Sequence, residues 1–207
     1  MGMELSILNM AGKATGKKVV LSKDIFEIEP NEHAIYLDVK QFLAANRQGT
    51  AKAKQRSENA HSTRKLGRQK GGGGARPGDF KSPVRVGGGT IFGPVPRDYD
   101  FKLNKKVKIL ARHSALSQRA KEGAIIVLDA LQFEAPKTKA MIAALDALKI
   151  ADKKVLFLTN DVNANAMKSA SNLQKVNVMK ASELNTYAVM NANIVVFTED
   201  ALAAYQA

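Results

Sequence analysis

The sequence predicts an α/β protein, a three-layer α/β/α sandwich around a mainly parallel sheet of about four strands. In the second half of the chain, short apolar runs alternate with helical stretches, as they do in strand-helix-strand units. Each run is apolar throughout, which is typical of parallel strands that are buried on both faces. The prediction also includes an N-terminal β-hairpin and a long extended internal loop.

The first elements are predicted from turn residues and from helical spacing. Residues 3–10 and 17–21 are rich in apolar side chains, and residues 11–16 between them contain two glycines that permit a tight turn, so a hairpin is expected. Asn31 then offers an N-cap for a helix that ends near Asn46. Four apolar residues share one face of this helix: Ile35, Val39, Phe42 and Leu43.

The elements after the internal loop follow from the same patterns. A helix over about 105–121 is predicted from the spacing of Leu103, Val107, Leu110, Ala111 and Leu116, and Gly123 is suited to end it. The predicted strands are then 124–128, 155–158, 176–178 and 194–197. The predicted helices are 138–149, 164–174, 186–191 and 199–205. The chain is therefore expected to form one globular domain over 1–207, interrupted by the loop.

Composition limits the possible partners. The 207 residues carry 32 basic and 19 acidic side chains, a net charge of +13, which favours polyanionic partners such as nucleic acid. A membrane partner is not expected, because no apolar run approaches the roughly 20 residues that a spanning helix needs. Cysteine is absent, which excludes disulfides and thiolate metal sites, and we expect neither a metal nor a cofactor.

The internal loop, called the basic segment (residues 47–97) below, concentrates this charge. It holds twelve basic residues against Glu58 and Asp79, so its net charge is 12 − 2 = +10. The basic residues are Arg47, Lys52, Lys54, Arg56, Arg64, Lys65, Arg68, Lys70, Arg76, Lys81, Arg85 and Arg97. Eleven of the fifteen glycines also lie there, and glycine lets a backbone pass close to folded RNA. Such a segment cannot bury a core of its own, so it is either a disordered linker or is ordered by RNA.

RNA contact explains why the segment is internal and why its charge recurs every few residues. Lysine and arginine neutralise phosphates, so these twelve residues are the predicted RNA-binding set. We add Lys105, Lys106 and Arg112 on the following helix. The only two aromatic residues of the segment, Phe80 and Phe92, are too few for a stacking platform of the kind found in single-strand-binding proteins.

The sequence lacks the motifs that would indicate a nucleotide-binding or catalytic site. A dinucleotide-binding glycine pattern would need glycine where Arg76, Pro77 and Phe92 stand. The three histidines are scattered along the chain, and no nucleophile lies in a recognisable elbow. Asp129 and Asp161 follow predicted strands, where carboxylates are common as turn and cap residues. No catalytic residue is therefore predicted.

Several separated motifs resemble one known family. They include Asn46-Arg47-Gln48-Gly49-Thr50, Arg68-Gln69-Lys70-Gly71, Gly74-Ala75-Arg76, Phe92-Gly93-Pro94 and Asn104-Lys105-Lys106. Together and in this order they resemble the bacterial large-subunit ribosomal protein four family over nearly the whole chain.

The resemblance implies a structural ribosomal protein in the cytoplasm, with an α/β domain and a loop that penetrates large-subunit ribosomal RNA. It implies that the loop tip lines the constriction of the nascent-peptide exit tunnel, beside large-subunit protein twenty-two and the nascent polypeptide. The residues that it places at the tunnel are Arg68, Gln69, Lys70, Gly71 and Arg76. It also implies a role in subunit assembly. The alternative is a regulator that binds a messenger RNA leader and controls ribosomal protein expression.

Overall fold

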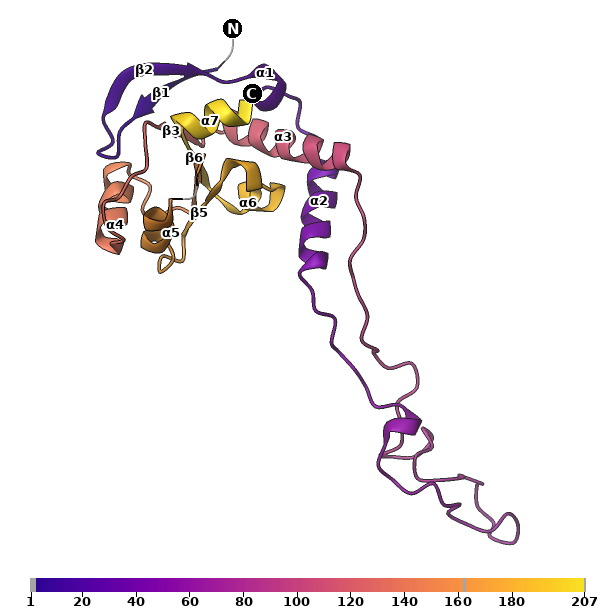
Figure 1. Cartoon of the computed structure of the whole chain (residues 1–207). Coiled ribbons are helices and arrows are strands. Elements are labelled where there is room, and N and C mark those ends of the chain that lie inside the picture. The colour runs from indigo at the N-terminus through magenta and orange to yellow at the C-terminus, as the bar shows by residue number, and fades with distance from the viewer. Residues whose placement is uncertain (1–2, 162, 207) are drawn as a thin grey trace. The chain divides into compact units, whose positions relative to one another are not determined.

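A single six-stranded sheet organises the part of the chain that carries the hydrophobic core (Figure 1). The computed structural model describes residues 3–161 and 163–206, and the strand order in them is β2-β1-β3-β6-β4-β5. The strands are β1 (Glu4–Leu8), β2 (Ala14–Val20), β3 (Ile125–Leu128), β4 (Val155–Thr159), β5 (Val176–Lys180) and β6 (Ile194–Thr198). The predicted α/β class and the four parallel strands β3 to β6 are confirmed.

The N-terminal hairpin extends this sheet instead of forming a separate element. β1 pairs antiparallel with β2 and parallel with β3, where Ile7 lies opposite Val127. Both side chains are buried, so the hairpin gains its apolar cover from the same core as the parallel strands. The sheet therefore has six strands, two more than the parallel set predicted from the sequence.

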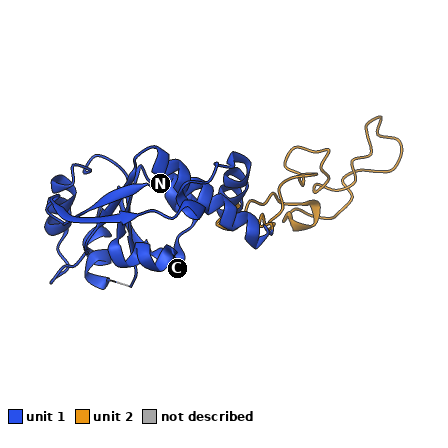
Figure 2. Cartoon of the chain, turned by 90° about the horizontal axis from the view of Figure 1, so that it is seen from above, with its two compact units in different colours: residues 1–43, 102–207 blue, residues 44–101 orange. Residues whose placement is uncertain are grey.

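The contacts among its own residues divide the chain into two compact units, which Figure 2 shows in different colours. The first unit comprises Met1–Leu43 and Lys102–Ala207 and holds the sheet. The second unit, Ala44–Phe101, covers the basic segment with a few residues on either side. Among the described residues, the 3-10 turn η1 (Arg56–Glu58) is the only regular element that lies wholly within this unit.

The helices of the first unit mostly match their predicted positions. They are α1 (Lys23–Phe26), α2 (Glu32–Ala45), α3 (Lys105–Lys121), α4 (Thr138–Ala147), α5 (Ala164–Ala170), α6 (Thr186–Asn191) and α7 (Glu199–Gln206), with a 3-10 turn η2 (Ala181–Glu183). The predicted cap of α2 is confirmed, because the Asn31 Oδ1 accepts the Ala34 N–H at 2.9 Å. The short helix α1 was not predicted, and α5 ends four residues earlier than expected.

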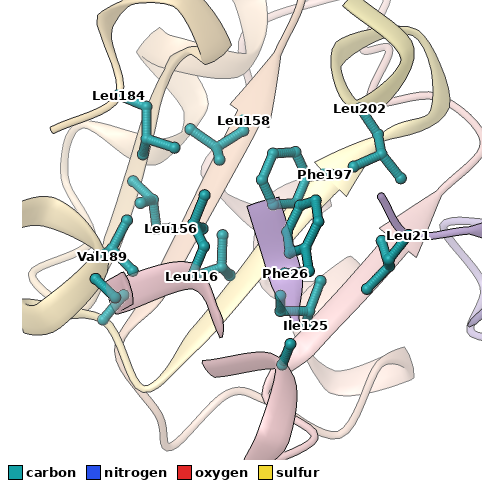
Figure 3. Close-up of a cluster of buried hydrophobic side chains, with 14 of the residues drawn as sticks. Leu21, Phe26, Leu116, Ile125, Leu156, Leu158, Leu184, Val189, Phe197 and Leu202 are labelled. Atoms are coloured by element: carbon teal, nitrogen blue, oxygen red, sulfur yellow. The ribbon is translucent and has the colours of Figure 1, made fainter. Parts of the chain in front are cut away.

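The core consists of two apolar clusters, one on each face of the sheet. Alternate residues of β4 belong to different clusters. Leu156 and Leu158 lie in the first cluster, and Val155 and Phe157 lie in the second. The first cluster, in Figure 3, packs α1, α2, α3, α6 and α7 against the sheet, with the Phe26 and Phe197 rings edge to face at 6.2 Å. The second packs α4 and α5 against the opposite face. The predicted three layers are thus present.

Two local predictions were wrong. The hairpin turn is shorter than residues 11–16, because the Asn9 side chain accepts the N–H groups of Ala11 and Lys13 and closes the turn before Ala14. On α2, Leu43 does not join the buried face, since its side chain is 52% exposed. Phe42, which was predicted on the same face, stacks on Tyr187 at a ring distance of 4.7 Å.

Candidate nucleic-acid interface

The predicted RNA-binding residues of the basic segment lie together in the second unit, with their side chains largely open to solvent. Those of Arg47, Lys52, Lys54, Arg56, Arg64, Lys65, Arg68, Lys70, Arg76 and Arg97 are exposed, and those of Lys81 and Arg85 are half-buried. Exposed guanidinium and ammonium groups on a glycine-rich backbone suit contact with a phosphate backbone.

At the base, Tyr99 lies between two arginines. The Arg47 guanidinium carbon is 3.8 Å from the centre of the Tyr99 ring, and that of Arg97 is 4.5 Å from it. A hydrogen bond from Arg97 lowers the pKa of the Tyr99 hydroxyl, and the charge of Arg47 adds to this effect. Tyr99 lies outside the segment defined from composition, so sequence reasoning missed its role.

Gly49 completes this base. The Arg97 N–H donates to the Gly49 carbonyl at 3.2 Å, so the two limbs of the segment meet here. A side chain at position 49 would put its Cβ 2.1 Å from the Arg97 carbonyl oxygen, and φ at Gly49 is +63°. Only glycine permits this approach, which explains a residue of the Asn46–Thr50 motif in physical terms.

Farther along, backbone hydrogen bonds keep the two limbs side by side. The Ala53 N–H donates to the Pro94 carbonyl at 2.9 Å, and the Thr90 N–H donates to the Lys54 carbonyl at 3.0 Å. Gly89 lies so close to the other limb that an added Cβ would be 2.4 Å from the Arg56 nitrogen. Gly88 and Gly89 therefore serve close packing of backbone on backbone, whereas Gly87 has open space around it and a left-handed φ of +82°.

Both acidic residues of the segment are held by basic residues of the same segment. The Lys52 Nζ is 2.6 Å from Glu58 Oε1, and this hydrogen bond is the main cause that lowers the pKa of Glu58. The Arg56 Nη2 is 3.0 Å from Asp79 Oδ1, and Asp79 is only 8% exposed. These pairs fix local geometry and leave the net charge of the segment at +10.

The tip of the segment gathers the five predicted tunnel residues around an open hollow. The Leu66 N–H donates to the Gly78 carbonyl at 2.9 Å and closes the tip. Within it, the Arg76 Nε donates to the Gln69 carbonyl at 3.0 Å, and the Lys65 Nζ donates to the Gln69 side chain. Arg68, Gln69, Lys70, Gly71 and Arg76 all line this hollow.

The three residues predicted on α3 differ in their surroundings. Lys105 and Lys106 are exposed in its first turn. Arg112 is half-buried and hydrogen bonds to Tyr205, and burial raises the pKa of the Tyr205 hydroxyl in spite of this cation. The Arg112 side chain is thus engaged within the first unit, and the two lysines are better placed for phosphate contact.

The described residues show no competing active site. In 3–161 and 163–206, no group of three or more histidine, aspartate or glutamate side chains could hold a metal ion. A polar crevice lies at the carboxyl ends of β4 and β6, but the Thr159 hydroxyl donates to the Asp161 carbonyl and Thr198 caps α7, so these groups serve local structure. No helix in this described part is long and apolar enough to cross a bilayer.

Comparisons with known proteins agree on one family. The family model described as "Ribosomal protein L4/L1 family" matches residues 19–207. Large ribosomal subunit protein uL4 of Phocaeicola vulgatus is 60% identical over 204 residues, which are 99% of this chain and 98% of that protein. The protein of the same name from Parabacteroides distasonis is 61% identical over 97% of this chain and 96% of its own length. That of Cytophaga hutchinsonii is 56% identical over 99% of both chains.

Proposed function

This chain belongs to the ribosomal protein L4/L1 family, and we propose that its basic segment binds large-subunit ribosomal RNA. It is a structural protein of the large ribosomal subunit rather than an enzyme. The observation that supports RNA binding is the set of twelve cations on limbs held together by backbone hydrogen bonds. Each phosphate that a cation neutralises releases counterions, so affinity arises from many exposed side chains at once.

The tip of the segment has a separate proposed role. By resemblance to the family, Arg68, Gln69, Lys70, Gly71 and Arg76 line the constriction of the nascent-peptide exit tunnel, next to large-subunit protein twenty-two and the nascent polypeptide. The geometry supports this assignment, because these five residues surround one open hollow. The limbs then anchor the tip in RNA, and this anchoring contributes to assembly of the subunit in the cytoplasm.

Salt dependence tests the proposed electrostatic mode. If six to ten phosphates are contacted, the slope of log affinity against log salt is roughly −5 to −9. Replacing Arg64, Lys65, Arg68 and Lys70 with glutamine should weaken binding and bring the slope closer to zero. Filter binding with a large-subunit RNA fragment at several salt concentrations measures both quantities.

A matched control removes equal charge from the first unit. Lys13, Lys17, Lys18 and Lys23 are exposed, and their replacement by glutamine lowers net charge by the same four units. This control should change the slope much less than the change in the basic segment. Equal slopes for the two variants, or salt-insensitive binding by the unaltered protein, would reject the proposed mode.

Sedimentation tests the ribosomal assignment in a second way. The protein should remain with purified large subunits after a high-salt wash, because the segment is enclosed by RNA in the proposed state. Release at moderate salt would instead indicate a peripheral factor.

A further inference from the structure

Phe92 displays its aromatic ring to solvent from an unusual backbone conformation. Its side chain is 104% exposed, and φ is 54°, a left-handed value that bulky residues adopt at an energetic cost. The next residue explains how this conformation is held: a Cβ on Gly93 would lie 2.7 Å from the Ala53 Cβ and 3.0 Å from the Thr90 methyl group. The chain is thus packed tightly beside Phe92 while the ring itself is directed outward.

The ring borders an open hollow between the two limbs, called the limb hollow here, with a volume of about 900 Å³. Ile91 and Val95 add apolar surface to it, and Arg56, Lys81 and Ser57 add cationic and polar groups. Its walls are held in place by the Arg56–Asp79 ion pair and by the Thr90–Lys54 backbone hydrogen bond. The limb hollow is therefore a feature of the folded segment and needs no large rearrangement to accept a ligand.

The two phenylalanine rings of the basic segment have different surroundings. Phe80 has the Arg85 guanidinium 5.4 Å from its ring centre and the His61 ring at 6.3 Å. Phe92 has no stacked ring or cation within the described ranges 3–161 and 163–206. The Phe92 ring is exposed at a hollow that Arg56 and Lys81 also line, and it stacks on no ring or cation of the described residues. This combination fits an aromatic, anionic ligand.

We propose that the limb hollow binds one unpaired nucleotide of the large-subunit RNA, with its base stacked on Phe92 and its phosphate beside Lys81. This inference rests on the proposed function, since RNA is the partner that the segment's charge of +10 favours. Unstacked bases are commonly recognised by stacking on aromatic side chains. Because Phe92 is a single ring, the site holds one base and is not a platform for a strand.

A tryptophan probe tests the stacking directly. The chain contains no tryptophan, so Phe92→Trp creates a unique fluorophore at the limb hollow. Val86→Trp is the matched control, because Val86 is 107% exposed on the same limb and does not line the limb hollow. Titration with a large-subunit RNA fragment should quench the fluorescence of the Phe92→Trp variant strongly and that of the control only weakly. Equal quenching in both variants would overturn the inference.

Affinity provides the second test. Phe92→Ala should weaken RNA binding about tenfold, within the range of base-aromatic stacking, and should leave the salt slope unchanged because no phosphate contact is lost. Val86→Ala should bind like the unaltered protein. Quenching of the position-92 probe by purified large-subunit proteins, and not by RNA, would assign the hollow to a protein partner and overturn the inference.

The outcomes separate this inference from the function on which it rests. Steep salt-dependent binding by the unaltered protein, combined with unchanged affinity of Phe92→Ala, rejects only the base site. Absence of salt-dependent RNA binding by the unaltered protein rejects both.

Discussion

At the scale of single residues, glycine has two distinct uses in the basic segment. Gly49 and Gly89 lie where another backbone approaches too closely for any side chain, whereas Gly72 has open space around it. Composition predicts a glycine-rich, extended segment but does not distinguish these uses, because the close approach depends on the opposite limb. The same limit applies to Tyr99, whose two arginine partners are 52 and 2 residues away in the sequence.

Gly89→Ala should loosen the contact between the limbs. The new Cβ would meet the Arg56 backbone at 2.4 Å, and overpacking of this kind costs about 1–3 kcal/mol. Amide hydrogen exchange should therefore be faster at Thr90, whose N–H donates to Lys54. Gly72→Ala is the control and should leave the exchange of Thr90 unchanged, while equal effects of the two changes would contradict the packing argument.

His113 on α3 should make the stability of the first unit depend on pH. Burial, with a smaller effect from the Arg112 charge, lowers its pKa below the ordinary value of 6.5. The unfolded chain therefore takes up a proton more readily, so the free energy of unfolding should fall as pH drops below about 6.5 through the folded-state pKa. Urea unfolding between pH 7.5 and 5.5 measures this decline.

His113→Gln should make that decline shallower, because the group that binds the proton on unfolding is gone. His33→Gln removes an exposed imidazole from α2 and should keep the decline of the unaltered protein. If both variants behave alike, His113 is not the source of the pH dependence.

At the scale of elements, most of the parallel sheet was predictable and its edge was not. The apolar runs at β4 and β6 are buried along their whole length, which is the pattern that identified them. The pairing of β1 with β3 was not predictable, since Ile7 meets Val127 across a separation of 120 residues that includes the basic segment. Local patterns identify strands, but a shared core decides which strands become neighbours.

Ile7→Ala tests the contribution of β1 to the common sheet. Ile7 is 1% exposed, and truncation of a buried isoleucine costs about 2–5 kcal/mol of unfolding free energy. Val20 on the outer strand β2 is 56% exposed, so Val20→Ala should change the free energy by less than about 0.5 kcal/mol. Urea denaturation compares the two, and similar small losses would mean that β1 adds little to the core.

At the scale of the whole molecule, the apolar core and the basic surface belong to different units. Both apolar clusters consist of residues from the first unit, and the second unit carries the twelve cations. Stability and RNA binding are therefore expected to be separable. The charge distribution along the sequence predicts such a separation, while the limb hollow depends on contacts between limbs and could not be predicted from sequence.

Deleting residues 50–95 and joining the ends by a short glycine linker tests this separation. The join is short because the Gly49 oxygen and the Arg97 nitrogen are only 3.2 Å apart. Ten basic and two acidic residues are removed, so the net charge falls from +13 to +5. The shortened protein should unfold in one cooperative transition and should no longer enter large subunits.

Loss of cooperative unfolding would show that the core needs the segment. Tight binding of a messenger RNA leader by the shortened protein would instead favour the regulatory alternative and assign that activity to the first unit.

The contacts between the limbs form a nested series, and this order affects the entropy of folding the segment. The outermost bond joins Gly49 and Arg97, the next two join Ala53 to Pro94 and Lys54 to Thr90, and the innermost joins Leu66 to Gly78. Closing one large ring in a single step would cost the entropy of its full length. The innermost bond encloses only residues 67–77, and once it has formed, each bond farther out restricts only the residues between it and the bond already made. The segment can therefore close in several smaller steps that begin at its tip.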